Sequence, residues 1–117
     1  MERTSRPPAD LTQERFPGHT LVTLRGEIDI ASAPDLRERL RAVLGTAGPR
    51  VVIDLSGVDF CDVSGLALLV EARRQAGSLG TDLTLSAPRP QLARLLKVTG
   101  LDRAFTVRHL TPCTVAA

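Results

Sequence analysis

The sequence predicts a single α/β domain built on a mostly parallel sheet. Strand-like and helix-like patterns alternate along the chain, and this order is typical of parallel strands joined by helices. The 117 residues suffice for one domain with one core, and 43% of them are hydrophobic, as in folded proteins. We therefore expect a mixed sheet of four or five strands with three main helices.

The first elements follow an N-terminal lead-in. Residues 1–18 are rich in proline and polar residues, so we expect a loose segment with only a weak edge-strand signal near Leu11. Residues 20–24 (Thr-Leu-Val-Thr-Leu) predict the first clear strand. Gly26 is expected to end it.

The first helix is expected to begin at Ser32, whose side chain favours the cap position. Pro34 and Asp35 suit its first turn. Gly45 is expected to end the helix, followed by Gly48 and a proline. Apolar residues recur between these limits at helical spacing, at Leu36, Leu40, Val43 and Leu44.

The centre of the domain is a buried strand followed by a helix. Residues 51–55 are apolar except for Asp54, which is typical of a central strand covered on both faces. A polar turn is expected next, and then a helix from Ser64 to about Leu79, with Gly80 beyond it.

The C-terminal part predicts one more strand, a helix and a last short strand. Leu83 and Leu85 alternate with polar residues in the strand, and Pro90 and Gly100 limit the helix. Residues 105–107 predict the last strand. We expect the domain to span residues 19–110 and to be followed by a flexible tail over 111–117.

Composition argues against several classes of protein. The net charge of +2 comes from 15 basic and 13 acidic residues, and the chain has no Trp or Tyr to stack on bases, so nucleic acid is not an expected partner. The longest apolar run, at 66–70, is too short to span a bilayer, and the N-terminus lacks an apolar signal region. We expect a cytoplasmic protein without membrane insertion.

The two cysteines point to neither a disulfide framework nor a metal site. Cys61 and Cys113 lie far apart and belong to no ligand-spaced cluster, and His19 and His109 have no ligand-spaced companion. Cys61, between Phe60 and an aspartate, is interpreted as a small buried hydrophobe. No cofactor or metal is expected.

The segment from residue 51 to 65 is the strongest candidate for a functional site. A buried strand delivers Asp62 and Ser64 to the start of a helix, where free backbone N–H groups favour an anion or a phosphorylated hydroxyl. The alternative is that both residues only cap the helix. Gly65 allows close approach either to a strand or to a partner, and one of Leu66 or Ala67 is expected at the surface.

The order of these pieces resembles the STAS domain of bacterial anti-sigma factor antagonists. Three segments carry the resemblance: residues 24–29 (Leu-Arg-Gly-Glu-Ile-Asp), residues 51–65 with the loop Asp-Val-Ser-Gly, and residues 95–101 (Leu-Leu-Lys-Val-Thr-Gly-Leu). Each is weak alone, but all three occur in order with the right gaps. The resemblance covers roughly residues 19–108.

The resemblance implies a binding module rather than an enzyme. Members of this family dock on an ATP-dependent anti-sigma kinase of the GHKL type and free the sigma factor that it holds. The kinase phosphorylates the serine after the loop aspartate, and a PP2C-type phosphatase resets the cycle. The partner-binding residues implied here are Glu27, Asp29, Asp62, Val63, Ser64, Gly65 and Leu66. Asp29 has an equal alternative as a simple turn residue.

This chain departs from the family at the phosphoacceptor position. The residue after Asp62 is Val63, which has no hydroxyl. Either Ser64 is the acceptor, one residue further on, or the site is not switched by phosphorylation. One residue in a helical turn rotates the side chain by about 100°. We therefore expect an unphosphorylated or poorly phosphorylated loop.

Two other functions compete with this one. Ser64, Asp62 and a histidine would suit a nucleophilic enzyme, but the loop lacks the Gly-x-Ser-x-Gly elbow of hydrolases and the chain lacks a phosphate-binding glycine-rich loop. STAS proteins also serve as subunits of lipid-transport ABC systems or as constitutive interaction modules. Co-purification with an ABC ATPase or with a kinase-like anti-sigma factor separates these alternatives.

Overall fold

The computed structural model describes residues 9–110, which form five strands and four helices. In chain order these elements are β1 (Asp10–Phe16), β2 (His19–Ile28), α1 (Ala33–Thr46), β3 (Arg50–Cys61), α2 (Val63–Leu79), β4 (Asp82–Ser86), α3 (Pro90–Thr99), α4 (Leu101–Ala104) and β5 (Thr106–Arg108). The four-residue α4 was not predicted. The tail expected over 111–117, with Cys113, lies outside the described residues.

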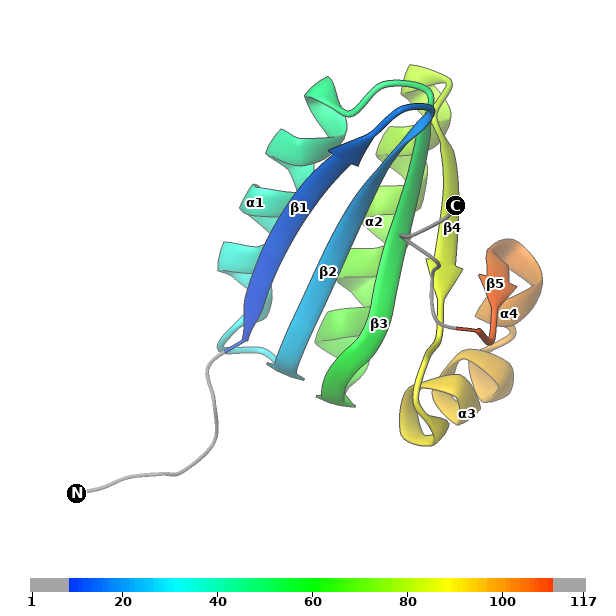
Figure 1. Cartoon of the computed structure of the whole chain (residues 1–117). Coiled ribbons are helices and arrows are strands. Elements are labelled where there is room, and N and C mark those ends of the chain that lie inside the picture. Colours follow the sequence, from blue (N-terminus) through cyan, green and yellow to red (C-terminus); the bar gives the residue numbers. More distant parts are fainter. Residues whose placement is uncertain (1–8, 111–117) are drawn as a thin grey trace.

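The five strands form one mixed sheet in the order β1-β2-β3-β4-β5. β1 is antiparallel to β2, and the other neighbouring pairs are parallel. α1 and α2 lie side by side on one face of the sheet, while α3 and α4 lie beyond the end of β4 near β5 (Figure 1). The predicted α/β class with a mostly parallel sheet is confirmed.

The weak strand signal near Leu11 corresponds to a full edge strand. β1 pairs with β2 along its whole length, from Asp10 opposite Arg25 to Phe16 opposite His19. Leu11 is only 5% exposed and belongs to the core. The sheet therefore begins at Asp10, so residues 10–18 are not a loose lead-in but the first strand and the turn of an antiparallel hairpin with β2.

β2 and β3 run further than the sequence predicted. β2 continues through Gly26 to Ile28, because Gly26 adopts a φ of +86° at an irregularity in the strand pairing instead of ending the strand. The expected polar turn after residue 55 is likewise strand. Two register shifts insert extra residues of β3 opposite β2, and the Asp54 carboxylate accepts from the Ser56 N–H at 2.9 Å beside them.

α1 extends one residue beyond Gly45, which the sequence predicted as its end. Gly45 lies inside the helix, α1 ends at Thr46, and Gly48 then turns the chain with a φ of +90°. A glycine in a helix costs propensity but does not stop the helix when its neighbours are anchored. The predicted ends of α2 and α3 at Gly80 and Gly100 are confirmed.

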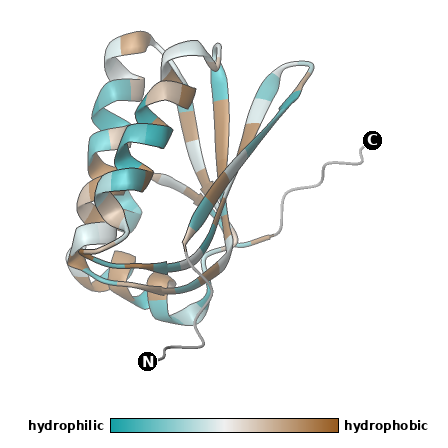
Figure 2. Ribbon diagram, turned by 90° about the vertical axis from the view of Figure 1, so that its left-hand side faces the viewer, coloured by the Kyte–Doolittle hydropathy of each residue, from teal (hydrophilic) through white to brown (hydrophobic). Residues whose placement is uncertain are grey.

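The core lies between the sheet and the pair α1 and α2. Apolar and polar residues alternate along the strands that face these helices (Figure 2). The fully buried side chains of this layer include Val22, Leu24, Leu36, Leu40, Val51, Ile53, Leu55, Leu68 and Leu69. A continuous apolar layer of this kind holds α2 firmly on the sheet.

Gly65 sets how closely α2 approaches the strands. A Cβ at this position would clash with the Sγ of Cys61 and lie 2.9 Å from Cγ2 of Ile28. The start of α2 therefore rests directly on the ends of β2 and β3. Of the two roles that the sequence left open for this glycine, the structure supports close helix-to-strand approach.

We expect Gly65→Ala to destabilise the fold by about 1–3 kcal/mol, because the added methyl overpacks this contact. Gly77→Ala is the matched control in the same helix, where a Cβ meets nothing within 4 Å. It should be neutral or stabilising by up to about 1 kcal/mol. Urea denaturation of both variants measures the difference, and equal effects would contradict the packing role of Gly65.

Candidate functional site

The two segments expected to carry the binding site meet at one edge of the sheet. Ile28 and Cys61, the last residues of β2 and β3, are paired in the sheet. The backbone N–H of Asp62 then donates to the carbonyl of Ile28 at 3.1 Å. Residues 27–29 and 62–66 therefore lie close together, although they are far apart in the sequence.

Asp62 is the only residue between β3 and α2, and it caps the helix. Its Oδ1 accepts from the N–H groups of Ser64 at 2.8 Å and Gly65 at 3.4 Å. Its negative charge also lies at the positive end of the helix dipole. The structure assigns the cap to Asp62 rather than to Ser64, and α2 begins at Val63.

Asp29 organises the turn between β2 and α1. Its Oδ1 accepts from the N–H groups of Ala31 and Ser32, each at 3.0 Å. The Ser32 hydroxyl donates to the carbonyl of Glu27 at 2.9 Å and accepts from the Asp29 N–H at 3.0 Å. Ser32 precedes α1 as predicted, but its side chain binds back to the strand end and makes no cap hydrogen bond.

Cys61 lies beneath this edge as a buried thiol. Its exposed fraction is 0%, and burial, with a smaller contribution from the charge of Asp62, raises the pKa of the Cys61 thiol to about 12. A thiol with this pKa is neutral near pH 7 and is a poor nucleophile. The interpretation of Cys61 as a small buried hydrophobe is confirmed.

Three large hydrophobic side chains are exposed at the same edge. Ile30 in the turn after β2 is 78% exposed, Phe60 near the end of β3 is 42% exposed, and Val63 at the start of α2 is 75% exposed. We refer to these three residues as the junction patch. Large apolar side chains that are exposed on neighbouring segments are candidates for an interaction surface.

The other residues expected at the site contribute in different ways. Ser64 and Glu27 are half-buried, and Gly65 is buried against the strands. Leu66, also expected at the site, is only 5% exposed, so its side chain belongs to the core and is not available at the surface. Ala67 is the exposed member of that pair.

α3 holds the end of β3 through one glutamine. The Oε1 of Gln91 accepts from the Cys61 N–H at 3.0 Å, and its Nε2 donates to the Cys61 carbonyl at 2.9 Å. Arg89 adds an ion pair with Asp59 at 2.9 Å. The start of α3 therefore fixes the residues that come directly before Asp62.

Residues 9–110 lack two features of other protein classes, a metal site and a membrane-spanning helix. Within this range no group of three or more His, Cys, Asp or Glu side chains is placed to hold a metal ion. No helix there is long and apolar enough to cross a bilayer. His19 begins β2, at the opposite edge of the sheet from Asp62, so these two residues and Ser64 do not form a nucleophilic set.

The family model described as Mlab, STAS domain, matches residues 12–112. The match covers the sheet from Thr12 onward and the junction of β3 with α2. The chain belongs to the STAS domain family.

Relatives within this family are anti-sigma factor antagonists. The anti-sigma-B factor antagonist of Listeria monocytogenes is 30% identical over 98 residues, which is 84% of this chain and 86% of the relative. That of Bacillus subtilis is 38% identical over 80 residues, or 68% of this chain and 72% of the relative.

A solved structure shows the same fold. The crystal structure of an anti-sigma factor antagonist from Mycobacterium paratuberculosis matches with a TM-score of 0.78 and 32% identity, covering 86% of this chain and 85% of that chain. The predicted family and fold are confirmed.

Sequence reasoning missed Ile30, Phe60 and Gln91. Ile30 carried a signal, because it is an isolated large apolar residue in an otherwise small and polar turn. Phe60 was assigned next to a turn, and its exposure depends on the bulged pairing of β3. No feature of the sequence marked Gln91, because glutamine is common in the first turn of a helix and its hydrogen-bond partner is 30 residues away.

We expect Gln91→Ala to destabilise the protein by about 1–2 kcal/mol, because it removes two hydrogen bonds to one buried peptide segment. Amide exchange of Cys61 should accelerate more than that of Val51 in the same strand. Gln75→Ala is the matched control, since Gln75 donates a single hydrogen bond to the Arg41 carbonyl at 3.1 Å. An unchanged exchange rate at Cys61 would contradict the role given to Gln91.

Proposed function

We propose that this chain is an anti-sigma factor antagonist that docks through the junction patch on an anti-sigma kinase of the GHKL type and so releases a sigma factor. Antagonist relatives that align with most of the chain support this proposal. The observation that carries it is Val63, which stands 75% exposed beside Asp62, where the family resemblance places the docking loop.

The chemistry of the edge favours apolar docking over ion pairing. The carboxylates of Asp29 and Asp62 already accept two backbone hydrogen bonds each. Ile30 and Val63 have no such internal role, and covering a side chain of this size contributes about 1.5–3 kcal/mol. In this scheme the apolar side chains supply affinity, and the aspartates hold the backbone that presents them.

The same geometry supports weak control by phosphorylation. Val63 occupies the exposed position after the aspartate but has no hydroxyl. Ser64 has the hydroxyl but is half-buried and rotated by about 100° around the helix. We propose that a kinase aligned on the exposed position phosphorylates this chain poorly, and that a PP2C-type phosphatase has a substrate here only if Ser64 is modified.

The docking surface is tested with a matched pair of valines. Val63→Arg should weaken binding to the cognate anti-sigma factor at least about tenfold, because it places a charge in the apolar contact. Val98→Arg adds the same charge on α3, at a valine with a similar exposure of 76%, and should change affinity less than about threefold. Calorimetric titration against each GHKL-type kinase of the same genome gives both values.

Equal losses in the two variants would contradict docking through the junction patch. Both variants should keep the circular dichroism spectrum of the wild type, since the two valines are outside the core. If no kinase of this type binds and the chain instead co-purifies with an ABC ATPase, the assignment as an anti-sigma factor antagonist is wrong.

A second experiment concerns the switch. Incubated with the kinase and ATP, the wild type should take up little phosphate, and any phosphate should be on Ser64. Val63→Ser should be phosphorylated at position 63, adding about −1.5 to −2 charge next to Asp62. Asp59 is already paired with Arg89, whereas the adjacent carboxylate of Asp62 repels this charge. Intact-mass analysis with fragment mapping locates the phosphate.

Phosphorylated Val63→Ser should bind the kinase at least about a hundredfold more weakly, because a dianion has to be desolvated in the interface. Ser64→Ala in the wild-type background is the control and should bind equally with and without ATP. If ATP weakens binding of the wild type as much as that of Val63→Ser, then Val63 does not set the regulation of this protein.

A further inference from the structure

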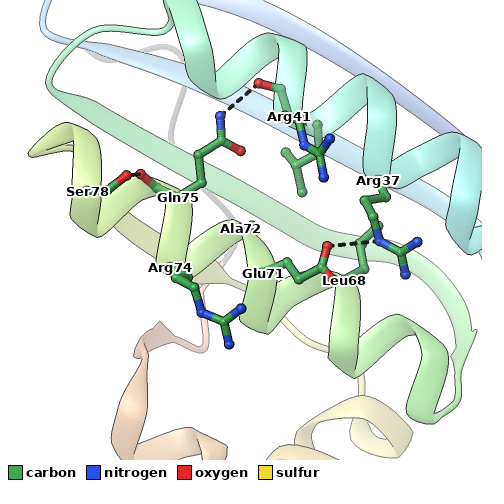
Figure 3. Close-up of a pocket in the computed structure, with 9 residues that line it drawn as sticks. Arg37, Arg41, Leu68, Glu71, Ala72, Arg74, Gln75 and Ser78 are labelled. Carbon is green, nitrogen blue, oxygen red and sulfur yellow. Dashed lines mark hydrogen bonds and ion pairs between the residues drawn. The ribbon is translucent and has the colours of Figure 1, made fainter.

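A cavity of about 640 Å³ lies on the outer side of the pair α1 and α2 (Figure 3). Buried or apolar side chains from both helices, Leu40, Leu68 and Ala72, line its inner part. A volume of this size is in the range of small-molecule sites, about 300–1,000 Å³. We refer to this cavity as the interhelical groove.

The charged side chains that line the interhelical groove are mostly basic. Arg37 and Arg41 extend from α1 toward α2, and Arg74 lies on α2 one turn after Glu71 (Figure 3). Three arginines and one glutamate therefore line the groove. Arg37 and Arg41 are also one turn apart on the same helix, an arrangement of like charges that is unfavourable without a counter-charge.

The acidic groups available do not balance these arginines. Glu71 Oε1 lies 2.9 Å from the Nε of Arg37, but this buried Nε makes no hydrogen bond, so the pair is an ion contact with poor alignment. The Arg41 guanidinium pairs at 3.6 Å with Glu38, an exposed residue that does not line the groove. Arg74 has no ion pair with any residue in 9–110. Among residues 9–110, Arg74 is thus left without a counter-charge, and Arg41 has only the longer, exposed pair with Glu38.

We infer that the interhelical groove binds a small molecule that carries phosphate groups. The planar fork of a guanidinium matches the oxygens of phosphate and binds them through two parallel hydrogen bonds. Arg41 and Arg74 are the primary ligands in this site, and Glu71 restrains Arg37 beside them. The apolar inner part accommodates a ring or a chain attached to the phosphate.

The site is distinct from the surface proposed for docking. Val63 lies at the start of α2, whereas Glu71 and Arg74 lie in its second half, so they are separated by at least two turns of helix. None of the residues of the junction patch lines the groove. Binding of a phosphate compound can therefore be measured without any partner protein.

The probe is sodium pyrophosphate, added at constant ionic strength to the isotope-labelled full chain and followed by ¹H–¹⁵N NMR. We expect saturable shifts confined to amides of α1 and α2 around residues 37–41 and 71–75. The double variant Arg41→Gln/Arg74→Gln should bind at least about tenfold more weakly. Glu71→Gln should bind more tightly, since it removes the only carboxylate of the groove.

The matched control is Arg94→Gln/Arg103→Gln, which removes the same charge from exposed positions of α3 and α4 outside the groove. It should bind pyrophosphate as the wild type does. Equal weakening in the two double variants, shifts that do not saturate, or shifts spread over arginines throughout the chain would each overturn the proposed site. Unchanged circular dichroism spectra confirm that the variants are folded.

Discussion

The close contact of the start of α2 with the ends of β2 and β3 is the constraint on which the candidate site depends. A single residue, Asp62, joins β3 to α2, so the start of the helix must lie directly beside the end of the strand. Its N–H donates to the carbonyl of Ile28, and Gly65 leaves no space between helix and strands. Gly65 faces the strands, and Val63 lies about 200° from it around the helix, so Val63 faces outward.

This arrangement changes the meaning of the two aspartates. Asp29 and Asp62 lie where the family resemblance suggested partner contacts, and in the structure both carboxylates hold the backbone of the turns in which they lie. The groups that remain fully available to a partner are apolar, chiefly Ile30 and Val63. Two turns held by hydrogen bonds thus present the hydrophobic side chains. Because the backbone of these turns is already ordered, less conformational entropy is lost when a partner binds.

α2 connects the two surfaces for which we propose binding. Its inner face packs on the sheet through residues such as Leu69 and Ala72, and its outer face carries Val63, Ala67 and Arg74 along one stripe. The amino end of this stripe is apolar and its carboxyl half is basic. The same helix therefore offers surfaces suited to chemically different ligands at its two ends.

The sequence by itself determined the order of the main strands and helices, the parallel core of the sheet and the end of α2 at Gly80. These follow from local periodicity and from residues whose backbone preferences are strong. It also indicated Asp62 as a cap, because the carboxylate and the N–H groups that it binds are neighbours in the chain.

Only the tertiary structure decided how β2 and β3 pair beyond residue 54, that Leu66 is buried, and that Gln91 holds Cys61. The bulges come from the match between two strands, and the Gln91 hydrogen bonds join segments 30 residues apart. The strand pairing and the Gln91 hydrogen bonds both depend on groups that only folding of the whole domain brings together. Local sequence preferences do not describe such long-range contacts, so the junction patch could be recognised only in the folded structure.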